Sequence, residues 1–273
     1  MAQKAHPNIL RPNCDLYKGS TYWNEPRFYY IISTINKLIE SCCLGTTHYL
    51  NKITINRHLG FIIIEIDLIH LHFRSKGRFI SRRFKENKKK VKKQSWTVVA
   101  SRLHTAIKLI QKLSGSKKIT LKINRLKSYT RSVPKPVRRQ LMYFNKGFNR
   151  TRYDYARYGM QLIYLLMLKK ANALTLSRFL TQNICSRQRR KRHYQFLAFI
   201  KQVFKALEPY RKITGLKIQI KGRFTHKAKG RSRSWKHQIG SIPLSQLDKN
   251  IQAQYVQTQT AYGSVGIKVW ICS

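Results

Sequence analysis

The charge balance is the feature that most limits what this chain can fold into. The 273-residue sequence holds 56 Lys and Arg against nine Asp and Glu, a formal net charge of +47. A globular protein with this balance repels itself unless a polyanion neutralises it. A merely solvated cationic surface is the alternative, and the spread of the excess along the whole chain argues against it. The sequence therefore predicts a nucleic-acid partner and an affinity that falls steeply with salt.

The chain also has enough apolar material to fold. Apolar residues make up 42% of the sequence and aromatic residues 11%, which excludes a disordered basic tail. Its length predicts one or two domains, with basic extensions that become ordered on RNA. Lys, Ile, Asn, Tyr and Phe are common, a bias typical of the A+T-rich genomes of organelles.

Cysteine and histidine usage predicts neither disulfides nor a metal or other cofactor. The five cysteines are an odd number without a C-x-x-C pair, which favours reduced thiols in a non-secretory compartment. His70 and His72 lie two residues apart in an apolar run, and no further ligand is spaced to join them on a metal.

No membrane segment is expected. The apolar run 61–73 is interrupted by Glu65 and Asp67, and the run 161–168 is far shorter than the ~20 residues that a span needs. The start, MAQKAHPNILRPN, resembles neither a signal peptide nor an amphipathic presequence. A protein of this kind that works in an organelle is expected to be made there.

The first half of the chain shows the pattern helix, two strands, helix and strand. Apolar spacing predicts helices over residues 28–40 and from Trp96 to a stop at Gly115. Strands are expected at 52–56, 61–73 and 118–123. The apolar positions of the second strand change from even to odd near Leu68, which indicates a bulge or break there. The cationic stretch 74–95 between strand and helix is interpreted as a loop or RNA-ordered extension.

The second half predicts another helix–strand unit. Residues 125–170 are irregular and rich in Arg and Tyr, as expected of an insertion between domains. Helices are expected at 173–184 and 189–208, where Pro209 provides a stop. Strands are expected at 216–220 and 265–271, with a basic link between them. Two such units separated by a linker predict a two-domain α+β fold.

Two stretches carry a resemblance to a known family. Residues 215–271 contain a GLKI strand that ends in a Gly-Arg pair, a basic loop, the pattern G-x-I-P-L-x-x-L, and a closing T-x-Y-G-x-x-G-x-K-V-W hairpin. This order of motifs closely resembles the second domain of the universal small-subunit ribosomal protein three family. The start, M-A-Q-K-A-H-P-N, is similar to the M-G-Q-K-V-H-P-N start of that family.

The resemblance implies a degenerate type II KH domain followed by a second α/β ribosomal domain, with basic insertions. The expected boundaries are an N-terminal extension and helix at 1–45, the KH-like domain at 46–124, a basic insertion at 125–172 and the C-terminal domain at 173–273. The family clamps RNA through a G-x-x-G loop in its KH domain. Here Gly77 stands alone in that region, so the clamp is absent from the sequence.

The same motifs give candidate RNA contacts. Their basic side chains suit phosphates, and Trp235 either stacks on an unpaired base or packs in the hairpin. Trp270 is expected in the core, and Gly263 and Gly266 in a hairpin. The expected rRNA-binding residues are Gln3, Lys4, His6, Lys221, Arg223, Lys227, Lys229, Arg231, Arg233, Trp235 and Lys236. By resemblance, the cluster facing messenger RNA is Arg189, Arg190, Arg192 and Lys201, with rRNA as its alternative ligand.

The predicted function is structural. The resemblance implies a constituent of the mitochondrial small ribosomal subunit that binds rRNA in the head and borders the channel through which messenger RNA enters. Neighbouring ribosomal proteins are expected partners, in the matrix. Mitochondrion is preferred to plastid because the G-x-x-G motif is lost and insertions are large. A free-standing RNA chaperone is the alternative.

An enzyme is not expected. The sequence has no phosphate-binding glycine loop, H-E-x-x-H or G-x-S-x-G motif. A two-metal nuclease or intron maturase needs clustered carboxylates. Glu65 and Asp67 are the only close pair of acids, and a strand would place both on one face.

Overall fold

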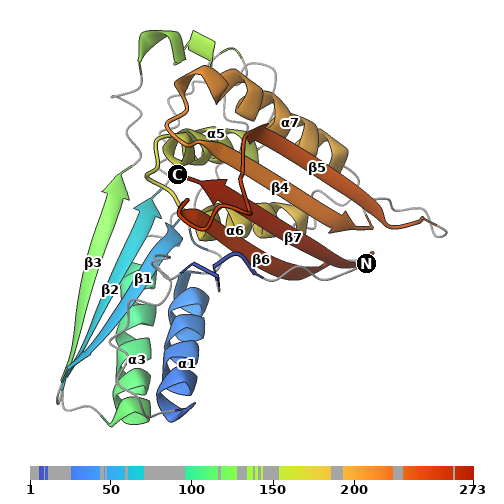
Figure 1. The fold of residues 1–273 in the computed structure, drawn as a ribbon. Helices are drawn as coiled ribbons and strands as arrows, with labels where there is room; N and C mark the ends of the chain where they lie inside the picture. The colour runs from blue at the N-terminus through green and yellow to red at the C-terminus, as the bar shows by residue number, and fades with distance from the viewer. Residues whose placement is uncertain are drawn as a thin grey trace, which may run out of the picture. The chain divides into compact units, whose positions relative to one another are not determined.

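The computed structural model describes residues 6–8, 10–11, 26–43, 46, 48–58, 61–70, 96–115, 118–127, 134–137, 139–140, 143, 154–185, 193–223, 230–260 and 262–273. The chain divides into two compact units (Figure 1). The first unit is Lys18–Lys127. The second unit joins Met1–Tyr17 to Ser128–Ser273.

The first unit is a three-stranded sheet with two helices. Its strands are β1 (His48–His58), β2 (Phe61–His70) and β3 (Lys118–Lys127), in the spatial order β1-β2-β3. β1 and β2 pair antiparallel, whereas β2 and β3 pair parallel. A parallel pair needs a crossover, and helix α3 (Trp96–Ser114) lies in that connection. Helix α1 (Pro26–Cys43) precedes β1.

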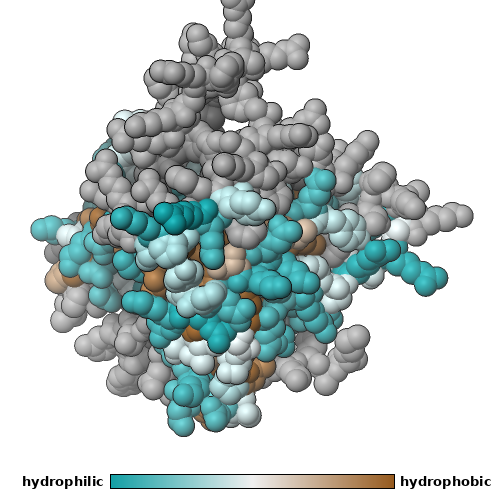
Figure 2. Space-filling model, turned by 90° about the horizontal axis from the view of Figure 1, so that it is seen from above, coloured by the Kyte–Doolittle hydropathy of each residue, from teal (hydrophilic) through white to brown (hydrophobic). Residues whose placement is uncertain are grey.

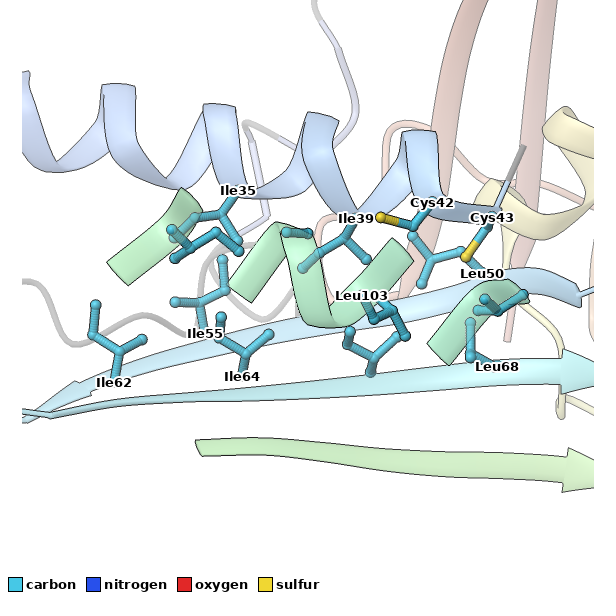
Figure 3. Packing of buried hydrophobic residues seen from close by; sticks show 14 residues of the cluster. Ile35, Ile39, Cys42, Cys43, Leu50, Ile55, Ile62, Ile64, Leu68 and Leu103 are labelled. Carbon is cyan, nitrogen blue, oxygen red and sulfur yellow. The ribbon is translucent and has the colours of Figure 1, made fainter. Parts of the chain in front are cut away.

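The core of the first unit lies between one face of the sheet and the two helices (Figure 3). Ile62, Ile64 and Leu68 alternate along β2 and are almost fully buried. Ile35 and Ile39 of α1 and Leu103 of α3 pack against them. The spacing of apolar residues, every second residue on the strand and every third or fourth on the helices, therefore correctly predicts the buried faces.

The bulge or break predicted in the strand at 61–73 is not in that strand: β2 runs unbroken past Leu68, and the bulge lies opposite it in β1. Leu50 pairs with Leu68 and Lys52 with Asp67, so Asn51 is an extra residue in β1. Asn51 is only 6% exposed. Such a bulge changes which side chains of its own strand reach the core, and Leu50 and Ile55, at an even and an odd position of β1, are both buried there. Ile69 of β2 is also buried, but it is not part of that core.

The second unit places three helices on one face of a four-stranded antiparallel sheet. The helices are α5 (Asp154–Met167), α6 (Ala173–Cys185) and α7 (His193–Leu207), followed by the 3-10 turn η3 (Glu208–Tyr210). The strands are β4 (Gly215–Gly222), β5 (Arg233–Gly240), β6 (Ile251–Thr260) and β7 (Gly263–Cys272), in the order β5-β4-β7-β6. α6 and α7 contact the sheet, and α5 contacts both of these helices.

Most predicted elements are confirmed, including the helix stop at Gly115, whose φ is +63°. Three elements are not predicted by the sequence patterns. α5 lies in the stretch interpreted as an insertion, and its residues 162–167 are all buried. The Arg- and Tyr-rich composition of residues 125–170 led to that interpretation, although Asp154, Arg157, Tyr158 and Gln161 follow the three-to-four spacing of one helix face. β5 and β6 escape prediction because edge strands that carry Gln, Ser and Lys lack a clear apolar alternation.

The domain boundaries differ from the prediction. The predicted boundaries leave α1 in an extension outside the KH-like domain, but α1 contributes Ile35 and Ile39 to the core of the first unit. They also leave α5 in the insertion 125–172, yet α5 packs in the second unit: a Cβ added at Gly159 would lie 2.8 Å from the ring of Phe179 on α6. Close helix packing thus makes this segment part of the second unit.

Residues near the N-terminus cover part of the other face of the second sheet. A small apolar group there consists of Ile251, Ala253, Trp270 and Cys272. The Asn8 side-chain amide donates to the Ala253 carbonyl oxygen (3.1 Å), and the Ala253 N–H donates to Asn8 Oδ1 (3.0 Å). One side chain therefore satisfies both backbone groups of a residue on an edge strand.

Arg11 fixes the loop that leads into β6. Its guanidinium donates to the carbonyl oxygens of Leu244 (3.0 Å), Gln246 (2.7 Å) and Lys249 (3.1 Å), and also to that of Pro7 (3.1 Å). Arg11 is 3% exposed, so the charge is stabilised by these oxygens rather than by water.

Replacing this buried guanidinium tests its contribution to stability. We expect Arg11→Met to lower the free energy of unfolding by about 2–4 kcal/mol, because buried carbonyl oxygens lose charged donors. The matched control is Arg211→Met, whose guanidinium makes only an exposed pair with Glu208 (3.4 Å) and should cost less than about 1 kcal/mol. Urea unfolding of both variants gives the comparison, and equal losses would contradict the role given to Arg11.

Candidate RNA interface

The pleat of the second sheet sorts the predicted RNA contacts onto two faces. Leu216, Ile218 and Ile220 of β4 are buried on the side that the helices cover. Trp235 pairs with Ile220 and therefore lies on the helix side, as does Arg233. Lys221 and Lys236 point to the opposite side, which we call the open face. The residues that the sequence analysis predicted as one RNA-binding cluster thus lie on two opposite faces of the sheet.

On the helix side, the side chains of β5 pack against α7. The Arg233 guanidinium donates to the Tyr194 hydroxyl oxygen (3.2 Å). The ring of Trp235 lies 5.9 Å from that of His237, which in turn lies 5.9 Å from Phe204. Trp235 therefore has the hairpin-packing role that is one of its two interpretations. Base stacking by Trp235 stays a prediction.

This edge also brings Lys201 near the β5 cluster. Burial lowers the pKa of His237, and the positive charge of Lys201 lowers it further. The sequence prediction gives Lys201 to messenger RNA and Arg233 to rRNA, yet β5 and α7 present both at one edge of the unit. Arg189, Arg190 and Arg192 lie outside the described residues, so their roles stay predictions.

The open face carries lysines that lie over aromatic rings. Lys268 Nζ lies 4.7 Å from the centre of the Tyr255 ring, and Lys217 Nζ lies 5.6 Å from that of Trp270. The Trp270 indole N–H donates to the Tyr255 hydroxyl (3.2 Å), which holds the two rings together. Trp270 is 8% exposed, so its predicted core position is confirmed. Lys217 and Lys268 are absent from the predicted RNA contacts, although their alternation with buried residues is visible in the sequence.

The remaining predicted contacts are partly described. Arg231 is exposed and Arg223 is half-buried, at the two ends of the basic loop between β4 and β5. His6 packs on Tyr255 with 4.4 Å between ring centres, and burial followed by the charge of Lys268 lowers its pKa. Gln3, Lys4, Lys227 and Lys229 lie outside the described residues. RNA contact by this whole set remains a prediction.

The structure also describes the predicted hairpin glycine. Gly263 (φ +129°) lies in the turn between β6 and β7, where the Thr260 hydroxyl donates to its carbonyl oxygen (2.8 Å), as expected of a hairpin glycine.

The face of the described surface in Figure 2 is mainly hydrophilic, with apolar residues in separate small areas. Within the described residues, no helix is both long and apolar enough to cross a membrane.

The acidic pair considered for a nuclease is engaged in the first sheet. Glu65 and Asp67 share the face away from the helices, as predicted. Lys122 Nζ donates to Glu65 Oε1 (3.2 Å), and Asn124 Nδ2 donates to Asp67 Oδ1 (3.1 Å). Among the described residues, no group of three or more His, Cys, Asp or Glu could hold a metal ion.

Comparison with known proteins identifies the second unit. Residues 187–271, which include α7 and almost all of the second sheet, match the family described as Ribosomal protein S3, C-terminal domain. The chain is 38% identical to small ribosomal subunit protein uS3c of Cyanophora paradoxa over 103 residues, 37% of this chain and 42% of that protein. Residues 187–271 are thus similar to the C-terminal domain of ribosomal protein S3, and the match with the Cyanophora protein spans less than half the length of that relative.

Two further relatives are also similar over only part of their length. The uS3c protein of Tetradesmus obliquus is 40% identical over 76 residues, 28% of this chain and 11% of that protein. The uS3 protein of Myxococcus xanthus is 24% identical over 128 residues, 46% of this chain and 55% of that protein. These matches therefore span well under two thirds of each relative.

The loop at the end of β4 gives a direct test of RNA contact in this protein. We expect the triple variant Arg223→Ala, Arg231→Ala, Arg233→Ala to bind rRNA more weakly. The slope of log affinity against log salt should fall by up to about 3, roughly one for each phosphate that no longer meets an arginine. Filter binding at several salt concentrations measures it. An unchanged slope would place the interface elsewhere.

The acidic pair gives the complementary test. Glu65→Gln with Asp67→Asn should leave RNA affinity unchanged, because both carboxylates already face polar partners within the sheet. RNA binding and RNA integrity are measured with the purified variant and the unchanged protein. If the unchanged protein cleaves RNA and the variant does not, the nuclease interpretation is revived.

Proposed function

We propose that this S3-family protein is a structural constituent of the small subunit of a mitochondrial ribosome and not an enzyme. It binds rRNA in the head of the subunit and borders the channel through which messenger RNA enters. The match of residues 187–271 to the S3 C-terminal domain carries the proposal, because it falls on the unit whose open face and β4–β5 loop present basic side chains.

The charge supports an RNA-bound state. With a net charge of +47, the isolated protein is expected to be poorly stable at low salt, and a polyphosphate partner relieves that repulsion. In the first unit, Glu65 is paired with Lys122, and Asp67 accepts a hydrogen bond from the neutral amide of Asn124. Neighbouring small-subunit proteins are proposed as additional partners.

The first unit supports a degenerate KH module. Its order of helix, two strands, helix and strand, with β2 and β3 parallel, suits a type II KH domain. The stretch where the G-x-x-G loop would stand lies between β2 and α3, outside the described residues, and its sequence has no such motif. We therefore propose a packing unit for rRNA rather than a clamp for free RNA.

The organelle is proposed from two considerations. Relatives with the organellar name uS3c support an organelle ribosome. Loss of the G-x-x-G motif together with basic insertions favours the mitochondrion over the plastid. For the messenger channel, the support is Lys201 on α7 and the basic run of residues 187–192 that precedes this helix.

Sedimentation and crosslinking test the function. A tagged copy should sediment with the small subunit of mitochondrial ribosomes, and its RNA crosslinks should concentrate in small-subunit rRNA of the head, with some messenger reads. Sedimentation with the large subunit, or free of ribosomes, would contradict the proposal. Crosslinks scattered over introns and tRNAs would instead support an RNA chaperone.

A further inference from the structure

We infer that the open face of the second sheet binds the sugar–phosphate backbone of double-helical RNA through four lysines arranged around Gln219. This inference rests on the proposed function and assigns its RNA contact to one surface. The four residues are Lys217, Lys221, Lys236 and Lys268.

Strand register fixes the arrangement. Gln219 on the central strand β4 pairs with Lys236 on β5 and with Lys268 on β7, which forms a row across three strands. Lys217 and Lys221 stand two residues before and after Gln219 on β4, so they share its face. Neighbouring positions are thus separated by about 5 Å across strands and about 7 Å along β4. The lysines surround the amide on all four sides.

The face has no acid to compete with a phosphate. The described residues that share it are Ser, Gln, Gly, Lys, Tyr, Trp, Ile, Ala and Cys residues of β4 to β7, without Asp or Glu. Lys221, Lys236 and Lys268 are exposed. Four like charges at this spacing repel each other, and bound phosphates reverse the sign of that interaction.

The aromatic rings favour backbone contact over base stacking. Tyr255 and Trp270 lie under Lys268 and Lys217, and they are joined by a hydrogen bond. The rings therefore position the ammonium groups and present no free plane to an unpaired base. His6 and Asn8 cover the β6 side of the same face, which confines the ligand to the β4, β5 and β7 region.

The two-dimensional spread favours a duplex. A single strand offers one line of phosphates, whereas this set spans both directions of the sheet. Double-stranded RNA is recognised through phosphates and 2′-hydroxyls across its wide, shallow minor groove. The Gln219 amide, at the centre, can donate to and accept from a 2′-hydroxyl while the lysines meet phosphates on either side. This geometry also predicts a preference for RNA over DNA.

A charge-matched pair of variants tests the surface. The face variant carries Lys217→Gln, Lys221→Gln, Lys236→Gln and Lys268→Gln; the control carries Lys37→Gln, Lys108→Gln, Lys112→Gln and Lys212→Gln, all exposed side chains elsewhere. Both lose the same charge. Circular dichroism and urea unfolding verify that each full-length variant folds. Affinities for an rRNA hairpin, a single strand and a DNA duplex are measured over a range of salt.

For the hairpin, the face variant should reduce the salt slope by about 4 and the control by less than about 1. Equal reductions in both variants would overturn the inference, as would equal dependence of single-strand binding on the four lysines. Gln219→Leu should reduce the ratio of the affinity for the RNA hairpin to that for the DNA duplex. An unchanged ratio would show that Gln219 does not contact a 2′-hydroxyl.

Ribosome gradients separate this inference from the proposed function. If the unchanged protein fails to join the small subunit, the function is wrong. If it joins, and the face variant joins equally well with the same RNA crosslinks, only the inference is wrong. Loss of a neighbouring protein with rRNA crosslinks intact would show that the face binds protein instead.

Discussion

The pairing of β4 with β7 is the constraint on which the second unit depends. Leu216, Ile218 and Ile220 stand directly opposite Ile271, Val269 and Ile267, so the apolar residues of both central strands fall on one face. A one-residue slip would turn all of them to the other side. Helices α6 and α7 cover this face, and α5 packs behind them.

That same alternation creates the surface opposite. Once the apolar residues face the helices, the intervening lysines must point away from them. Glycines permit the close approach at the strand ends: Gly240 has φ +66°, and a Cβ there would lie 2.2 Å from the Thr214 carbonyl oxygen. The apolar core and the lysines of the open face therefore both follow from the same alternation of residues along the strands.

The described charged side chains of this cationic chain are stabilised in two ways. Arg11 is buried against carbonyl oxygens, which accept its hydrogen bonds without the need for an acid. Glu65, one of nine acids, pairs with Lys122 on the exposed face of the first sheet. The remaining excess of Lys and Arg is left available for phosphate, which agrees with a structural role in a ribonucleoprotein.

Local periodicity in the sequence was enough to predict the α+β character and the apolar faces of α1, α3, β2 and β4. The closing C-terminal hairpin was implied by the resemblance to the ribosomal protein three family, and the bulge expected in β2 lies in β1. The placement of α5 in a core came from the folded structure, because the Arg- and Tyr-rich composition around this helix is typical of an exposed insertion. The fold likewise showed that Arg233 and Lys236, three residues apart, lie on opposite faces. It also joined Asn8 and Arg11 to the β6 region, because contacts between residues more than 200 positions apart depend on how the chain folds back and leave no local pattern.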